Sequence, residues 1–209
     1  MKKLVLILSA ICIFNTTFSQ KIDVKNIEIL RDSYGVPHIY AKTDAELAYG
    51  LAWAHSEDDF KTIQEAYLAG NGLLSKYIGL RGAPADFLTQ LIRSDYVVDS
   101  LYNTIDKNFI KVIEGYAQGI NKFAELNPDQ VLVKKLFPIT PKKMVKYSFL
   151  QLFISSEGDK AIRSIFDNNV TNISFLDDNK LGSNLFAFST NITKNGETYL
   201  GINTHQPLD

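Results

Sequence analysis

A strand-turn-strand pattern near the C-terminal end most constrains how this chain folds. The run from Leu185 to Thr190 is rich in apolar residues, an Asn195-Gly196 pair follows, and a second apolar run leads to His205. An Asn-Gly pair between two such runs is a strong signal for a tight turn between antiparallel strands. We therefore predict a β-hairpin over this region.

The expected register follows from a three-residue loop of Lys194, Asn195 and Gly196, since such loops favour glycine at the left-handed third position. It pairs four positions across the strands: Thr193 with Glu197, Thr190 with Leu200, Phe188 with Ile202, and Leu185 with His205. One predicted face is apolar: Phe186, Phe188, Ile192, Leu200 and Ile202. The other is small and polar: Ser183, Ala187, Ser189, Gly201, Asn203 and His205. A two-residue loop would divide the apolar set between both faces, so we prefer the three-residue loop.

The step Gly182-Ser183-Asn184 at the start of this hairpin is typical of a masked nucleophile. Cutting the bond before Ser183 would give that serine a free α-amino group, whose ordinary pKa is about 7.7 to 8. One residue would then supply both the nucleophile and its base. The predicted register places His205 diagonally beside Ser183. On this local pattern alone, an unreactive turn serine and a structural histidine remain open as alternatives.

Four segments, in order along the chain, carry a resemblance to a known family: residues 27–39, 44–70, 115–121 and 182–205. They resemble the penicillin acylase family of N-terminal nucleophile hydrolases, which includes the acyl-homoserine lactone acylases. The resemblance implies an α+β fold of the αββα type. This chain would hold the mostly helical α-chain region and the first hairpin of the β chain.

The resemblance also implies roles for individual residues. Gly182-Ser183 would be the bond of self-cleavage, and Ser183 the catalytic nucleophile and first residue of a β chain. His205 matches a position that the family fills with histidine or glutamine, where it supports the nucleophile. The β chain would be the partner of the α chain in a heterodimer. No cofactor is required for the chemistry, no metal ligand is assigned, and a structural calcium ion is expected only in the full-length protein.

The resemblance leaves the substrate open. In the family, the oxyanion hole comes from residues that would lie beyond Asp209, so we expect a precursor fragment that is inactive alone. Phe186 stands where many relatives have tryptophan, and Thr204 where proline is usual. An acyl-amine, an acyl-homoserine lactone and a β-lactam side chain are all candidate small-molecule substrates. The alternative is a secreted binding module without catalysis, or an unprocessed inactive relative on the same scaffold.

Residues 1–20 are typical of an export signal. Lys2 and Lys3 precede an apolar run over residues 4–14, which is shorter than the roughly 20 residues that span a bilayer. The only cysteine, Cys12, lies in this run, so we expect a mature chain without disulfides. We expect a periplasmic or extracellular protein with no stable membrane anchor. The formal net charge of −1 argues against a nucleic-acid partner.

The rest of the pattern predicts a helical region. A hairpin is expected over residues 27–40, followed by a helix that Thr43 and Glu46 begin with a capping box and that ends at Gly70. Further helices are expected over residues 100–125 and 141–165. The expected divisions are a signal peptide (1–20), an α-chain region (21–166), a connector (167–182) and the start of the catalytic β chain (183–209).

Several residues that could take part in metal binding, catalysis or substrate binding are interpreted as structural. Four titratable residues lie close together in the first predicted helix: His55, Glu57, Asp58 and Asp59. They do not share one helical face, so a metal site is not expected there. His38 is expected to be a satisfied core residue. Three aromatic residues in the last predicted helix have a spacing that favours core packing over an acyl pocket: Tyr147, Phe149 and Phe153.

Overall fold

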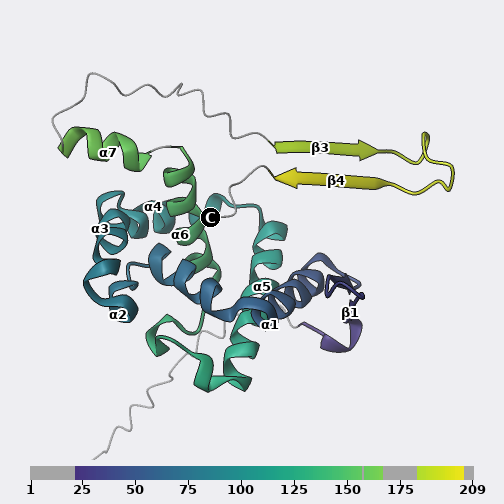
Figure 1. Cartoon of the computed structure of the whole chain (residues 1–209), viewed down its shortest axis with the longest axis horizontal. Coiled ribbons are helices and arrows are strands. Elements are labelled where there is room, and N and C mark those ends of the chain that lie inside the picture. Colours follow the sequence, from purple (N-terminus) through teal and green to yellow (C-terminus); the bar gives the residue numbers. More distant parts are fainter. Residues whose placement is uncertain (1–21, 157, 167–182, 205–209) are drawn as a thin grey trace, which may run out of the picture. The chain divides into compact units, whose positions relative to one another are not determined.

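The computed structural model describes residues 22–156, 158–166 and 183–204, and Figure 1 shows their helices and strands. The chain divides into two compact units, Met1–Ser156 and Glu157–Asp209, and each unit is described by itself. Helices dominate the first unit, and an antiparallel hairpin occurs in each. This is the α+β composition that the sequence predicts.

The first unit contains these elements in order: η1 (Val24–Asn26), β1 (Glu28–Arg31), β2 (Pro37–Tyr40), α1 (Asp44–Gly70), α2 (Ser75–Ile78), η2 (Gly79–Gly82), α3 (Ala83–Leu91), α4 (Ser94–Leu101), η3 (Tyr102–Thr104), α5 (Lys107–Leu126), η4 (Pro128–Gln130), η5 (Lys134–Leu136) and α6 (Pro141–Ser155). The second unit contains α7 (Gly158–Phe166), β3 (Ser183–Phe188) and β4 (Tyr199–Thr204). Each of the two later predicted helices is therefore divided in two: α4 ends before α5 begins, and α6 ends before α7.

The predicted first hairpin is confirmed, with β1 and β2 paired antiparallel. The carboxylate of Asp32 accepts hydrogen bonds from the backbone N–H groups of Tyr34 and Val36, at 2.9 and 3.0 Å. Gly35 has a φ of 82°, a conformation that glycine adopts without strain. The local residues of the turn thus account for its geometry.

Helix α1 begins with the predicted cap. The hydroxyl oxygen of Thr43 accepts a hydrogen bond from the backbone N–H of Glu46 at 3.2 Å. The side-chain amide of Asn26 donates to Oε1 of Glu46 at 2.9 Å, which ties the segment before β1 to the helix. This hydrogen bond from Asn26 lowers the pKa of the Glu46 carboxyl below its ordinary value. Glu46 is 6% exposed.

A pH dependence follows from this lowered pKa. Glu46 stabilises the fold above the ordinary glutamate pKa of about 4.3, and the contribution is lost as the pH falls through the lower pKa of the folded state. We expect Glu46→Gln to make the free energy of unfolding decline less between about pH 6 and about pH 3. Urea unfolding at both pH values measures this. Glu28→Gln, at an exposed strand position, is the control; an equal effect of both substitutions would contradict the prediction.

Helix α1 is interrupted at Asp59, where the sequence pattern predicts an unbroken helix. Asp59 has φ −155° and ψ 73°, outside the helical region. Its carboxylate accepts a hydrogen bond from the backbone N–H of Thr62 at 3.0 Å and so caps the second half of the helix. The kink therefore has an identifiable cause in a local side-chain cap.

The core of the first unit lies mainly between α1, α5 and the segment leading into α6. Helices α1 and α5 lie side by side in Figure 1. Four of its side chains are almost completely buried: Leu68, Ile120, Leu136 and Ile139. Gly119 of α5 faces α1 so closely that an added Cβ would lie 2.6 Å from the carbonyl oxygen of Tyr49. A Cβ at Gly115 would meet the carbonyl oxygen of Ala45 in the same way. These glycines set how closely the two helices approach.

The second hairpin forms as predicted, but its predicted register is wrong. Ser183 lies opposite Thr204 and Phe188 lies opposite Tyr199. Leu185 lies opposite Ile202, not opposite His205 as the three-residue loop predicts. The strands pair only as far as Phe188 and Tyr199, so the connection is a long loop over residues 189–198.

A second turn within this loop explains the shift in register. The expected turn is present: the N–H of Gly196 bonds to the carbonyl oxygen of Thr193, and Gly196 has a φ of 71°. However, the N–H of Ile192 also bonds to the carbonyl oxygen of Ser189. Residues 189–192 therefore form a separate turn opposite residue 198. The extra residues on one side displace the pairing of every position beyond them.

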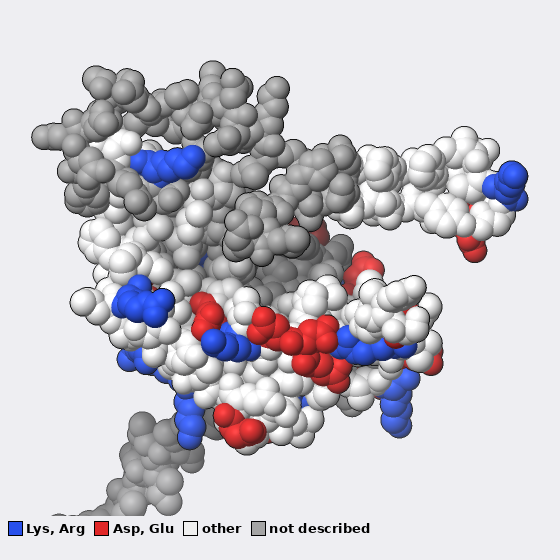
Figure 2. All heavy atoms as spheres, viewed as in Figure 1, with Lys and Arg blue, Asp and Glu red and all other residues white. Residues whose placement is uncertain are grey.

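The corrected register redistributes the apolar residues over both faces of the hairpin. One face carries Leu185, Ala187, Leu200 and Ile202, and the other carries Phe186, Phe188, Tyr199 and Gly201. Large side chains on each face are exposed, for example Leu185 at 63% and Phe186 at 53%. Figure 2 shows strands without charged residues and charges only at the tip, where Lys194 and Glu197 occur. A sheet with two apolar faces is typical of one covered on both sides.

Candidate functional site

Ser183, the predicted nucleophile, is the first residue of β3 and lies opposite Thr204 at the end of the hairpin away from the loop. Position 183 is in phase with Leu185 and Ala187 along the strand. Gly182 and His205 lie outside the described residues, as does the predicted connector at 167–182. The cleavage bond and the supporting role of His205 stay predictions. The diagonal placement of His205 beside Ser183 rested on the wrong register and does not carry over.

The four titratable residues that lie close together in α1 each have a structural partner. Glu57 and Asp58 form ion pairs with Arg31 of β1 at 3.3 and 2.8 Å. The ring nitrogen Nδ1 of His55 lies 3.0 Å from the hydroxyl oxygen of Tyr116 on α5. Asp59 caps the second half of α1. Within the described ranges, no group of three or more histidine, cysteine, aspartate or glutamate side chains is placed to hold a metal ion.

Arg31 is a residue whose part in this arrangement the sequence pattern does not reveal. Its guanidinium donates to the carbonyl oxygen of Gly35 at 2.8 Å as well as bridging to the two carboxylates. The hydrogen bond to Asp58 is the largest cause that raises the pKa of the guanidinium above its ordinary value. Arg31 thus joins the first hairpin to α1.

Of the remaining sequence-based assignments, one is wrong and one is confirmed. His38 is not a core residue: half of its side chain is exposed, and its Nε2 lies 3.4 Å from the carboxylate of Asp32. The core packing expected of Tyr147 is confirmed, since its ring meets that of Tyr67 edge to face with centroids 5.4 Å apart. Burial raises the pKa of the Tyr67 hydroxyl. Phe149 and Phe153 are half-buried and lie outside the main core cluster.

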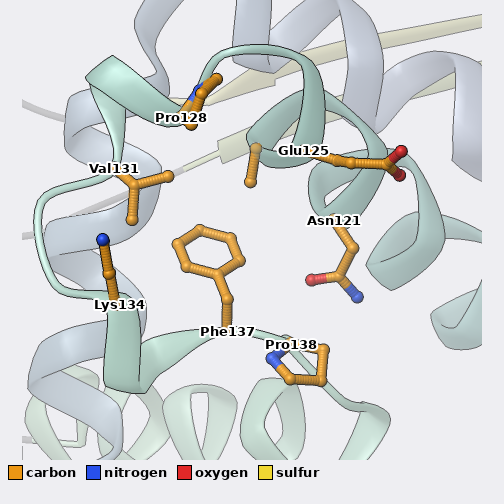
Figure 3. Close-up of a pocket in the computed structure, with 8 residues that line it drawn as sticks. Asn121, Glu125, Pro128, Val131, Lys134, Phe137 and Pro138 are labelled. Atoms are coloured by element: carbon orange, nitrogen blue, oxygen red, sulfur yellow. The ribbon is translucent and has the colours of Figure 1, made fainter.

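A pocket of about 320 Å³ lies where the end of α5 meets η4 and η5. Figure 3 shows the ring of Phe137 pointing into it, with Val131 and Lys134 on one side and Asn121 and Glu125 on the other. Its lining is mainly apolar. The carboxylate of Glu125 accepts a hydrogen bond from Nζ of Lys122 at 3.0 Å. This volume is at the lower end of the range for small-molecule pockets.

Asn121 holds the chain segment that forms one wall of this pocket. Its side-chain amide donates to the carbonyl oxygen of Ile139 at 2.8 Å, and its side-chain oxygen accepts from the N–H of Ile139 at 2.7 Å. Ile139 is 2% exposed, so its backbone groups depend on such a partner. This pairing gives a structural reason for an asparagine at position 121.

We expect Asn121→Ala to destabilise the protein by about 2 to 3 kcal/mol, because it leaves two buried backbone groups of Ile139 without partners. Chemical denaturation monitored by circular dichroism measures the change. Asn108→Ala, at an exposed position of the same helix, is the matched control and should change stability by less than about 0.5 kcal/mol. Equal effects would exclude a special role for the Asn121 pairing.

No helix in the part of the chain that the structure describes is long and apolar enough to cross a bilayer. The structure is similar to thermostable penicillin G acylase from Alcaligenes faecalis, with a TM-score of 0.53 at 18% identity, covering 78% of this chain and 98% of that chain. At this identity the likeness shows the fold alone, and the described part of this chain has an α+β composition of helices with two antiparallel hairpins.

The sequence comparison identifies the family. The family profile described as penicillin amidase matches residues 26–209, so the chain belongs to this family. Penicillin G acylase of Escherichia coli is 27% identical over 142 residues, which are 64% of this chain and 16% of that protein. Acyl-homoserine lactone acylase PvdQ of Pseudomonas fluorescens is 23% identical over 211 residues, covering 86% of this chain and 27% of that protein. Aculeacin-A acylase of Actinoplanes utahensis is 32% identical over 92 residues, or 44% of this chain and 11% of that protein. The chain thus spans about a quarter or less of these relatives.

Proposed function

We propose that the full-length protein is an exported hydrolase of linear amides that acts through Ser183 after cleavage of the Gly182-Ser183 bond. The observation that carries this proposal is the family match, which runs through residues 26–209 and includes the hairpin that Ser183 begins. The relatives named above are acylases of penicillin G, of acyl-homoserine lactones and of aculeacin A. Amide hydrolysis is the chemistry that these names share.

The proposed maturation uses the same side chain as the turnover. The hydroxyl oxygen of Ser183 attacks the carbonyl carbon of Gly182, and the peptide bond gives way to an ester. Water hydrolyses that ester, which leaves a carboxylate at Gly182 and a free α-amino group on Ser183. With an ordinary pKa of about 7.7 to 8, this amine is unprotonated in roughly a tenth to a sixth of the molecules at pH 7, and that fraction can accept the hydroxyl proton.

In the proposed turnover, the α-amino group of Ser183 accepts the hydroxyl proton as Oγ attacks the amide carbonyl of the substrate. The proton passes to the leaving amine, and the acyl group stays on Ser183 as an ester. Water then attacks the ester carbonyl and loses a proton to the same amine. That proton passes to Oγ of Ser183 as the ester bond breaks, and the carboxylic acid is released. His205 is proposed to support this arrangement. A structural calcium ion is proposed only for the full-length protein, with no ligand assigned.

The test uses the full-length gene product expressed with its N-terminal export signal. Mass spectrometry should show two polypeptides, the second of which begins Ser-Asn-Leu. Acyl-homoserine lactones of several chain lengths, a phenylacetyl amide and a glutaryl amide then screen for the acyl group. A single uncut chain without activity toward any of them would favour the alternative, a secreted binding module on the same scaffold.

A further inference from the structure

The sequence contains two Asn-Gly steps, Asn71-Gly72 and Asn195-Gly196. Asparagine is one of the thermolabile residues, and a following glycine has no Cβ to obstruct a reaction at its own backbone nitrogen. The two glycines adopt similar left-handed conformations, with φ of 63° and 71°. The two steps therefore differ mainly in how the structure holds each asparagine side chain.

Asn71 follows the last residue of α1, and the backbone of two helices holds its side chain. The side-chain amide donates hydrogen bonds to the carbonyl oxygen of Tyr67 in α1, at 2.8 Å, and to that of Lys143 in α6, at 3.1 Å. Both Asn71 and Gly72 are partly buried. Turning the amide toward the nitrogen of Gly72 would break both hydrogen bonds. The structure thus opposes any reaction between Asn71 and its glycine.

Asn195 lies in the loop between β3 and β4 (Figure 1), and its side chain bonds to near neighbours in the chain. The amide nitrogen donates to Oε2 of Glu197 and to the hydroxyl oxygen of Tyr199, each at 2.5 Å. The side-chain oxygen accepts from the backbone N–H of Glu197 at 3.4 Å. All three residues are exposed, so water competes for these bonds and each of them restrains the side chain little.

The glycine of this step is also accessible. A Cβ built on Gly196 would meet no atom within 4 Å. Its N–H makes a long hydrogen bond, of 3.4 Å, to the carbonyl oxygen of Thr193. Nothing in the described part of the loop therefore obstructs an approach of the Asn195 side chain to this nitrogen.

We propose that Asn195 is a site of spontaneous deamidation in the folded protein, whereas Asn71 keeps its amide. The backbone nitrogen of Gly196 attacks Cγ of Asn195, and the new bond closes a succinimide ring. The bond between Cγ and Nδ2 breaks, and ammonia leaves with the proton that the Gly196 nitrogen loses. The proposal does not depend on amide hydrolysis by Ser183.

Water then opens the ring and returns a proton to the Gly196 nitrogen. Cleavage of the bond from this nitrogen to Cγ gives aspartate at position 195. Cleavage of the bond from the nitrogen to the main-chain carbonyl carbon gives isoaspartate, in which the backbone runs through the side chain. Both products carry a carboxylate where the asparagine had an amide.

The new carboxylate would loosen the end of the hairpin. Nδ2 of Asn195 donates to the Glu197 carboxylate in the intact protein, whereas a carboxylate at position 195 would place two negative charges side by side. Isoaspartate also lengthens the backbone before Gly196, within the turn that the hydrogen bond to Thr193 closes. We expect the amide hydrogens of this loop to exchange faster after the reaction.

The test incubates the full-length protein at mildly alkaline pH, which speeds the attack because the Gly196 nitrogen must lose its proton. Mass spectrometry of proteolytic peptides measures the fraction of each asparagine that is converted over time. We expect conversion at Asn195 to be about tenfold or more faster than at Asn71, where two hydrogen bonds must first break. In concentrated guanidinium chloride the two rates should become similar, because unfolding removes the contacts of both side chains.

Variants and an internal control identify the reacting step. Gly196→Ala places a methyl group beside the attacking nitrogen and should slow conversion at Asn195 severalfold, with Asn71 unchanged. Asn191, exposed in the same loop but followed by the β-branched Ile192, should keep its amide. Equal rates at Asn71 and Asn195 in the folded protein, no conversion at Asn195, or a rate at Asn195 unaffected by Gly196→Ala would each overturn the proposal. Circular dichroism verifies that the variant is folded.

Discussion

Replacing Ser183 with alanine is expected to leave the full-length protein as one uncut polypeptide without amide hydrolase activity. Both effects have one cause, because the proposed self-cleavage and the proposed turnover use the same hydroxyl oxygen. Removal of a serine nucleophile lowers turnover by about 10⁶-fold in a well-studied hydrolase, which here means activity below detection. Denaturing electrophoresis, mass spectrometry and initial rates with the best substrate of the screen measure the outcome.

The hairpin offers a matched control for this experiment. Ser189 is exposed in the loop after β3, where its carbonyl oxygen, not its hydroxyl, bonds to Ile192. Ser189→Ala should therefore be cut and active like the parent protein. Equal cutting in the Ser183→Ala variant would show that another residue or a separate protease processes the chain. An active but uncut Ser183→Ala protein would exclude Ser183 as the nucleophile.

Replacing Gly115 with alanine is expected to destabilise the protein by about 3 kcal/mol or more, although the same change stabilises an exposed helix by about 1 kcal/mol. The change in stability has the opposite sign here because the added methyl group would clash with the backbone carbonyl of Ala45. A backbone atom cannot relieve the clash by changing rotamer, as a side chain can. For a domain of this size the melting temperature should fall by roughly 6 to 12 °C. Thermal and urea denaturation measure both quantities.

Lys111→Ala, at an exposed position one turn before Gly115 in α5, is the control for helix propensity and should change stability little. A Gly115→Ala variant as stable as the parent would mean that α1 and α5 separate at little cost. It would also contradict the close approach seen at Gly119, where a Cβ would lie 2.8 Å from that of Ala52. The two glycines are one turn apart on α5 and are expected to behave alike.

Ser183 could be selected as the candidate nucleophile from the sequence because the residues next to it in the chain form a recognisable pattern. The step from glycine to serine stands directly before an apolar run, and the structure begins β3 at Ser183. The residues next to Arg31 in the chain form no such pattern. The partners of Arg31 lie on α1, 26 and 27 residues away. A single sequence contains no sign of this relation.

Short-range features of this protein follow from its sequence. The cap at Thr43, the turn at Gly35 and the left-handed Gly196 each depend on the dihedral preferences and side-chain donors of a few neighbouring residues. These interactions form between groups that the chain already holds close together. For that reason the local pattern was sufficient to predict the first hairpin and the start of α1.

The tertiary structure was needed where the partner lay far along the chain, or where a second turn lay beside the predicted one. The register of β3 and β4 depended on an additional turn at residues 189–192, and a shift by an odd number of residues reverses the faces of one strand relative to the other. The need for glycine at 115 and for asparagine at 121 depended on Ala45 and Ile139, which only folding brings into contact. Such contacts depend on how whole helices pack, and a pattern of neighbouring residues does not determine that packing.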